Sequence, residues 1–187
     1  MEKLPPLLNS TSMLTCAEDL GMIPACVPKV MNELKILSLE IERMPKDYGI
    51  QFGELKKYPY LSVCTTSTHD MSGIRGWWES NREIIQNYYN NVLKRKGEAP
   101  PVADPKICEE IIINHLGSSS MFCILPIQDW LSCDGLLRRE NPHEEQINDP
   151  SNSGHYWRYR LHISMEDLID NENFNMSIRN KILESNR

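Results

Sequence analysis

The sequence lacks any long hydrophobic run, which excludes the classes of protein that depend on one. No stretch of its 187 residues approaches the roughly 18 consecutive apolar residues that span a bilayer. The first residues, 1–6, show no positive region followed by an apolar one, so no secretory signal is predicted. We therefore expect a cytoplasmic protein with no membrane partner.

Positive charge is also in short supply. The chain has 20 Lys and Arg against 26 Asp and Glu residues, a formal net charge of −6 and a pI near 5.4. Its longest basic run, Lys94 to Lys96, is typical of an exposed helix end. Because a protein that binds nucleic acid needs a basic surface to neutralise phosphates, we expect no nucleic-acid partner.

Motifs for disulfides, metals and cofactors are missing as well. The six cysteines form no C-x-x-C pair, which favours a reduced, cytosolic protein. Three of them lie in apolar runs and are expected to be buried as small hydrophobes: Cys16, Cys64 and Cys123. The His143-Glu144 pair lacks the second histidine of a zinc helix, and no glycine-rich phosphate loop occurs. We expect no metal and no organic cofactor.

What the sequence does contain is an alternation of short apolar runs with helical patterns. Such alternation is typical of parallel β/α units whose strands are buried on both faces. We predict strands at residues 13–17, 36–41, 60–66 and 121–127, and helices at 23–35, 74–92 and 107–116. About four strands are too few for an eight-stranded barrel, which typically needs about 250 residues.

The remaining segments are simpler to interpret. Four aromatic residues in the 74–92 helix have helical spacing, which favours core packing over stacking on sugars: Trp77, Trp78, Tyr88 and Tyr89. Residues 130–163 are polar and predicted to be irregular. Ser164 is a plausible capping residue for a helical tail that continues to the last residue.

Carboxylates follow three of the four predicted strands, at Asp19, Asp70 and Asp129. In β/α barrels the catalytic groups lie where strands end. Glycosyl transfer uses one carboxylic acid to protonate the leaving oxygen and negative charge to stabilise an oxocarbenium-like transition state. Acidic residues at these positions also cap helices, so the pattern alone leaves both interpretations open.

The residues around these carboxylates resemble the 4-alpha-glucanotransferases of glycoside hydrolase family 77. The resembling segments follow the family order and cover nearly the whole chain: AEDLG at 17–21, TSTHD at 66–70, LPIQD at 125–129, ENPHE at 140–144, INDP at 147–150 and HYWRYR at 155–160. The last three resemble the variety found in plant cytosol and some bacteria. The resemblance implies an α/β fold, the C-terminal part of a (β/α)8 TIM-type barrel, and an α-glucan or maltooligosaccharide substrate.

The resemblance also implies roles for single residues. Glu18 corresponds to the general acid/base, and Asp70 to the carboxylate that stabilises the transition state. His69 corresponds to a hydrogen-bond donor to the sugar. Three further residues are candidates for sugar contacts, with a cap, a turn or core packing as the alternative for each: Asp19, Asn148 and Trp157.

The sequence departs from the family pattern at several points. No position matches the R-x-D segment that carries the family's nucleophile, and the strands that precede the acid/base segment are missing. Gln146 stands where relatives usually carry arginine, and Ala17 where many have glycine. We therefore expect residues 1–163 to be the C-terminal half of a catalytic barrel, beginning at an internal methionine, and 164–187 to be a helical tail.

Three hypotheses about activity follow. The first is a retaining glucanotransferase whose isolated chain is inactive without the nucleophile. The second is a non-catalytic barrel half that at most binds glucan. The third treats Glu18 and Asp70 as an inverting hydrolase pair, which requires carboxyls about 6.5–9.5 Å apart. The exposed edges of a partial barrel also predict self-association as a dimer of halves, with an assembly partner or poor solubility as the alternatives.

Overall fold

The computed structural model describes residues 2–187, which form two compact units. The first unit comprises the chain up to Thr65 together with Ser118–Ile124. The second comprises Thr66–Gly117 and Leu125–Arg187. The chain therefore enters the second unit directly after a strand, returns for one short strand and leaves again.

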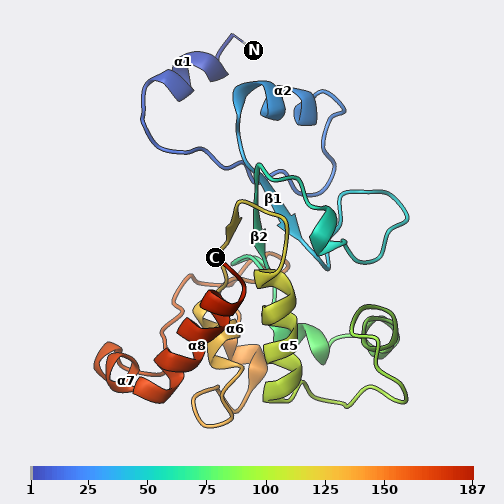
Figure 1. Ribbon diagram of the computed structural model, residues 1–187, viewed down its shortest axis with the longest axis vertical. Helices are drawn as coiled ribbons and strands as arrows, with labels where there is room; N and C mark the ends of the chain where they lie inside the picture. The colour runs from blue at the N-terminus through green and yellow to red at the C-terminus, as the bar shows by residue number, and fades with distance from the viewer. Residues whose placement is uncertain (1) are drawn as a thin grey trace. The chain divides into compact units, whose positions relative to one another are not determined.

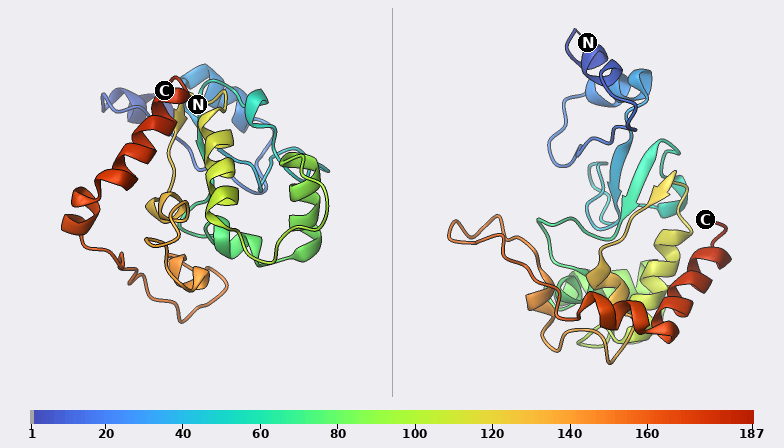
Figure 2. Two further views of the ribbon diagram at one scale, coloured as in Figure 1. Left: turned by 60° about the horizontal axis from the view of Figure 1, so that its bottom comes forward. Right: turned by 90° about the vertical axis from the view of Figure 1, so that its left-hand side faces the viewer.

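A parallel sheet forms the centre of the first unit (Figures 1 and 2). Its strands are β1 (Ser38–Ile41), β2 (Ser62–Thr65) and β3 (Phe122–Cys123), in the order β1-β2-β3. Leu39 pairs with Val63, which in turn pairs with Phe122. All four residues of β2 are buried, as expected for the central strand of a parallel sheet. The predicted α/β class with parallel strands is confirmed.

The first predicted strand, residues 13–17, is wrong, because this segment makes only one parallel bridge, between Cys16 and Leu37. The Leu37 N–H donates to Thr15 O at 2.9 Å, and the Ala17 N–H donates to Leu37 O at 2.8 Å. The next donor on this edge, the Leu39 N–H, does not continue the ladder. It donates to Oδ1 of Asp19 at 2.8 Å, so a side chain takes the place of the backbone acceptor and ends the pairing.

Strand β3 is much shorter than the predicted 121–127. Pro126 has no N–H to donate to a ladder, and it stands directly before α6 (Ile127–Leu131). Gln128 and Asp129 therefore lie in a helix and not at a strand end. Within residues 2–187, β3 pairs with β2 alone, and its own Phe122 and the following Ile124 are exposed. Self-association through such an edge stays a prediction.

The helices of the first unit are short. They are α1 (Leu4–Asn9), α2 (Val27–Leu34) and the 3-10 turn η1 (Leu55–Lys57). Helix α2 has Pro28 in its first turn, as predicted, and it ends at Leu34, followed by Lys35, whose left-handed φ of 56° caps the last turn.

The second unit is helical, and the predicted helix 74–92 is divided in it. Asn81 accepts hydrogen bonds from the N–H groups of Glu83 (3.0 Å) and Ile84 (3.1 Å), so a new helix starts there. The predicted cap at Ser164 is confirmed, because its Oγ accepts from the Asp167 N–H at 3.0 Å. The elements are α3 (Ile74–Trp78), α4 (Arg82–Asn87), the π-helix η2 (Tyr88–Val92), α5 (Pro105–Leu116), α6, the 3-10 turn η3 (Pro142–Glu145), α7 (Met165–Asp170) and α8 (Glu172–Glu184).

Helix α8 lies beside α5 in the second unit (Figures 1 and 2). Lys181 of α8 reaches Glu109 of α5, with Nζ and Oε1 2.7 Å apart. The boundary that the sequence predicts between residues 163 and 164 stays a prediction.

The aromatic residues of α3 and η2 form part of the core. Trp78 and Tyr88 are fully buried and meet edge to face, with ring centroids 6.4 Å apart. Trp77 meets Tyr88 at 4.9 Å in the same geometry. The indole N–H of Trp78 donates to Pro100 O at 2.9 Å, so its polar atom is satisfied. These contacts confirm core packing, as the helical spacing predicts.

Two kinds of feature are missing from the described part of the chain. No helix within residues 2–187 has the length and apolarity that crossing a membrane requires. The same residues contain no group of three or more His, Cys, Asp or Glu side chains placed to hold a metal ion.

The six thiols differ in exposure. Cys64 and Cys108 are buried, Cys123 and Cys133 are half-buried, and Cys16 and Cys26 are exposed. The prediction that Cys16 is buried is therefore wrong, because its segment is held by a single bridge and is open on its outer side. Burial raises the pKa of the Cys108 and Cys133 thiols to about 12. Since the thiolate is the reactive form, both should be inert in the folded protein.

We expect only two thiols to react with Ellman's reagent in the native protein at pH 8. Cys26 should react first. Cys16 should follow more slowly, because partial burial and the nearby Asp19 charge raise its pKa. The other four should react only after denaturant is added. The variant Cys26→Ser should lose the fast phase alone, and rapid reaction of a third thiol would contradict this packing.

Candidate functional site

Four of the six predicted site residues meet in the second unit. Nδ2 of Asn148 donates to Oδ1 of Asp70 at 2.6 Å, and the Asn148 N–H donates to His69 O at 2.9 Å. Nε2 of His69 lies 3.5 Å from the same Asp70 oxygen. The ring of Trp157 lies 5.1 Å from the His69 ring, centroid to centroid. We call these four residues the Asp70 cluster.

The Asp70 cluster is open to solvent on one side. The side chains of His69 and Asp70 are 47% and 39% exposed, and Trp157 is 62% exposed. Asn148, in contrast, is buried at 9% exposure. A carboxylate, an imidazole and an indole therefore face outward above a buried amide. A carboxylate that accepts, a ring nitrogen that donates and an apolar ring face are groups that suit a polyhydroxylated ligand.

Three segments build the cluster, and the first of them is distant in sequence from the other two. His69 and Asp70 follow β2 in a loop without regular structure, and Asn148 follows η3. The segment of Trp157 is tied to that of Asn148 by His155, whose Nε2 lies 2.9 Å from Ile147 O. Regular backbone pairing contributes little here, so side-chain hydrogen bonds fix the geometry.

The buried carboxylate of Asp129 holds the loop that carries His69 and Asp70. Its Oδ2 accepts from the hydroxyls of Thr66 (2.5 Å) and Ser67 (3.3 Å). Its Oδ1 accepts from the N–H of Ile74, the first residue of α3, at 2.8 Å. Asp129 is only 1% exposed. A carboxylate at a helix N-terminus is stabilised by the unpaired N–H groups and the helix dipole.

Gly73 is required beside this carboxylate. A Cβ at position 73 would lie 2.7 Å from Oδ1 of Asp129, closer than real Cβ contacts allow. Any larger residue would therefore displace Asp129 or the start of α3.

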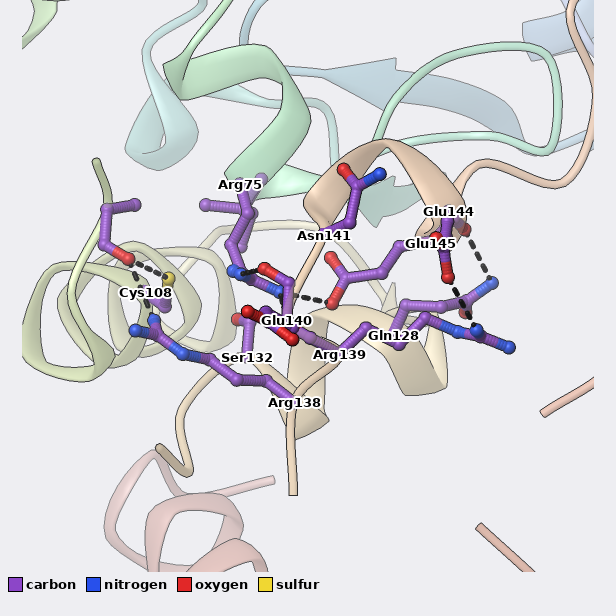
Figure 3. A network of polar contacts seen from close by, with 12 residues as sticks. Arg75, Cys108, Gln128, Ser132, Arg138, Arg139, Glu140, Asn141, Glu144 and Glu145 are labelled. Carbon is purple, nitrogen blue, oxygen red and sulfur yellow. Dashed lines mark hydrogen bonds and ion pairs between the residues drawn. The ribbon is translucent and has the colours of Figure 1, made fainter. Parts of the chain in front are cut away.

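A second buried contact joins α3 to the segment before Asn148 (Figure 3). Nη1 of Arg75 lies 2.6 Å from Oε1 of Glu145, and their side chains are 7% and 3% exposed. The Arg75 guanidinium also donates to the carbonyl oxygens of Arg139 (2.7 Å) and Glu140 (3.2 Å). Gln128 of α6 donates to Glu145 O at 3.3 Å. We call Arg75 and Glu145 the buried ion pair.

The electrostatic setting of Glu145 is unfavourable to its charge. Burial raises the pKa of the Glu145 carboxyl, Arg75 lowers it, and the nearby Asp129 charge raises it further, with a net increase. The Glu145 charge thus has one buried guanidinium as its partner and a second buried carboxylate nearby. A pair of this kind adds less to stability than its short distance suggests.

The other two predicted residues lie in the first unit. Both oxygens of Asp19 are engaged by protein groups, Oδ1 by the Leu39 N–H and Oδ2 by Nζ of Lys46, each at 2.8 Å. Lys46 also contacts Oε1 of Glu40 at 2.8 Å. Glu18 is exposed beside Asp19. Asp19 therefore fixes the segment that carries Glu18 to the edge of β1.

Sequence reasoning missed the supporting residues Arg75 and Glu145 and gave Asp129 no supporting role. One signal was present, because Arg75 is the only charged residue in the apolar helix α3. A guanidinium on such a helix needs buried acceptors. Nothing in the sequence indicates that Glu145 and two carbonyl groups provide them.

Comparison with solved structures identifies the fold. The chain is similar to amylomaltase from Streptococcus agalactiae in complex with acarbose, with a TM-score of 0.67 and 22% identity. The match covers 92% of this chain and 32% of that one. Amylomaltase from Corynebacterium glutamicum matches with a TM-score of 0.59 and 13% identity. At these identities the likeness shows the fold, an α/β arrangement that matches part of amylomaltase.

Comparison of sequences identifies the family. Residues 2–166 match the 4-alpha-glucanotransferase family, and the chain belongs to this family. It is 40% identical over 187 residues to 4-alpha-glucanotransferase DPE2 of Oryza sativa subsp. japonica, which covers all of this chain and 20% of the relative. A 4-alpha-glucanotransferase of Chlamydia pneumoniae is 33% identical over 178 residues, and the match covers 93% of this chain and 33% of that relative. The resemblance stated from the motifs is confirmed, and the chain spans a fifth to a third of these relatives.

We expect Asp129→Asn to destabilise the second unit by about 1.5–3 kcal/mol, because hydrogen bonds to a charged acceptor are lost or weakened. The amide would also place a donor against the Thr66 hydroxyl or the Ile74 N–H. Urea unfolding measures the change. Asp170→Asn, at an exposed position, is the matched control and should leave the midpoint unchanged. Equal midpoints for the two variants would show that Asp129 does not hold the loop.

Proposed function

We propose that this chain supplies the proton-transferring and transition-state-stabilising groups of a retaining 4-alpha-glucanotransferase. The enzyme transfers α-1,4-glucan segments between maltodextrins in starch, glycogen or maltose metabolism. The observation that carries the proposal is the Asp70 cluster, in which a half-exposed carboxylate is held by a buried amide beside two outward-facing rings. Membership of the family supports it.

Asp70 acts on the sugar at the cleaved bond. Asn148 holds one of its oxygens at 2.6 Å, and the exposed side of the carboxylate accepts hydrogen bonds from ring hydroxyls. These bonds strengthen as positive charge develops on the sugar, so they lower the barrier more than they tighten substrate binding. His69 donates a hydrogen bond to the same sugar, and the exposed indole of Trp157 stacks on a sugar face.

Glu18 acts as the general acid and base. It protonates the glycosidic oxygen as the donor bond breaks, and later takes the proton of the acceptor hydroxyl. Asp19 holds its segment through Leu39 and Lys46. No position in the sequence matches the family's R-x-D nucleophile. Without that nucleophile this chain forms no covalent intermediate and has no turnover on its own.

The ligand proposed for the Asp70 cluster is an α-glucan or maltooligosaccharide. The amylomaltase of Streptococcus agalactiae to which the fold is similar was solved in complex with acarbose. A second candidate function is glucan binding without catalysis. It is favoured by the sequence, in which no position matches the family's R-x-D nucleophile.

Azide tests the catalytic proposal, because this small anion can take the place of a missing carboxylate nucleophile. It attacks C1 as the C1–O bond breaks, and Glu18 gives its proton to the leaving oxygen. With maltotriose we expect no glucose release by the 187-residue chain alone and azide-dependent cleavage when azide is added. Both Glu18→Gln and Asp70→Asn should abolish that cleavage.

A second donor separates the two roles. In α-maltosyl fluoride the leaving group needs little protonation, so azide-dependent fluoride release should survive Glu18→Gln and be lost in Asp70→Asn. Glucan binding without azide-dependent cleavage of either donor would establish the second candidate function. Cleavage that both variants retain would overturn the assignment of both residues.

A further inference from the structure

The buried ion pair lies one step away from the Asp70 cluster, and it closes a ring of contacts. Loop residues His69 and Asp70 lead into α3, which carries Arg75. Arg75 holds η3 through Glu145, and the chain after η3 returns to the loop at Asn148. Asn148 then contacts both the His69 carbonyl and the Asp70 carboxylate.

Two links of this ring are direct polar contacts, and the other two are continuous chain. Arg75 binds three acceptors that belong to one segment: Oε1 of Glu145 and the carbonyl oxygens of Arg139 and Glu140. Figure 3 shows the Arg75 side chain pointing into this segment. Gln128 of α6 contacts the Glu145 carbonyl from another element. The position of the segment that leads to Asn148 is therefore set from α3 and α6 together.

We infer that Arg75 and Glu145 are positioning residues for Asp70, which they hold in its glucan-binding geometry by fixing the segment that delivers the Asn148 amide. The inference rests on the proposed function of Asp70 as the sugar-contacting carboxylate. Neither residue of the pair touches the sugar in this account, because both are buried.

The kind of contact favours positioning over stability as the role of the pair. A buried pair adds little net stability, and apolar residues of similar volume would often serve equally well. What an arginine adds is direction, because its planar guanidinium binds several acceptors in a fixed geometry. Three acceptors spread over η3 and the residues before it use that geometry. The position of the segment thus depends on the several fixed N–H donors of the guanidinium and not on its charge alone.

The test compares a change of geometry with a change of charge. Arg75→Lys keeps the positive charge and loses the planar set of N–H donors, so the affinity for maltoheptaose should fall about tenfold. Glu145→Gln keeps an oxygen acceptor for Arg75 and should retain affinity within about threefold, whereas Glu145→Ala should lose as much as Arg75→Lys. The matched control is Arg95→Lys, in the half-exposed Arg95–Glu110 pair on the same unit, which should bind as the unsubstituted chain does.

A second measurement, which needs no ligand, accompanies the binding titrations with maltoheptaose. The side-chain amide signal of Asn148 in nuclear magnetic resonance spectra should shift in Arg75→Lys and stay in place in Arg95→Lys. Retained maltoheptaose affinity and an unmoved Asn148 signal in Arg75→Lys would overturn the inference while leaving the proposed function intact. If the unsubstituted chain binds no maltoheptaose, the proposed function fails, and the Asn148 signal still decides whether the pair positions this amide. Near-ultraviolet circular dichroism confirms that each variant is folded.

Discussion

The buried carboxylate of Asp129 is the contact on which the candidate site depends. The loop that carries His69 and Asp70 has no regular secondary structure, so its backbone has no ladder or helix to fix it. Asp129 replaces that support by accepting from Thr66, Ser67 and the first N–H of α3. A charged acceptor suits this place because three donors converge on it, one of them at a helix N-terminus.

In the candidate site the side chains that can contact a ligand are therefore exposed, and the side chains that hold them in place are buried. Groups that can meet a ligand, such as Asp70 and Trp157, are exposed, while Asp129 and Arg75 lie beneath them and are nearly inaccessible. Precise sites need this arrangement, because an exposed side chain keeps its geometry only when its neighbours are fixed. The arrangement also has a cost, seen in the raised pKa of the Glu145 carboxyl, whose charge is only partly compensated by Arg75.

Local signals predicted what local interactions decide. Strands 36–41 and 60–66, Pro28 in α2 and the Ser164 cap follow from nearby residues, and the motifs brought out His69, Asp70, Asn148 and Trp157. Two failures had local causes, Pro126 after β3 and the Asn81 cap within 74–92, and the others came where distant contacts decide. Asp19 ends the pairing of residues 13–17, and the partners of Asp129 and Arg75 lie 55 to 70 positions away in sequence. A single sequence does not encode such pairings in its periodicity.

The central claim is that glucan binds at the Asp70 cluster, and the four tryptophans allow one direct measurement. Trp157 is 62% exposed beside His69, whereas Trp78 is buried with its indole N–H bonded to Pro100. The indole N–H signals of the ¹⁵N-labelled chain are followed while maltoheptaose is added. The account predicts that the Trp157 signal moves and that those of Trp77, Trp78 and Trp130 do not. A titration that moves Trp130 and leaves Trp157 in place would contradict it.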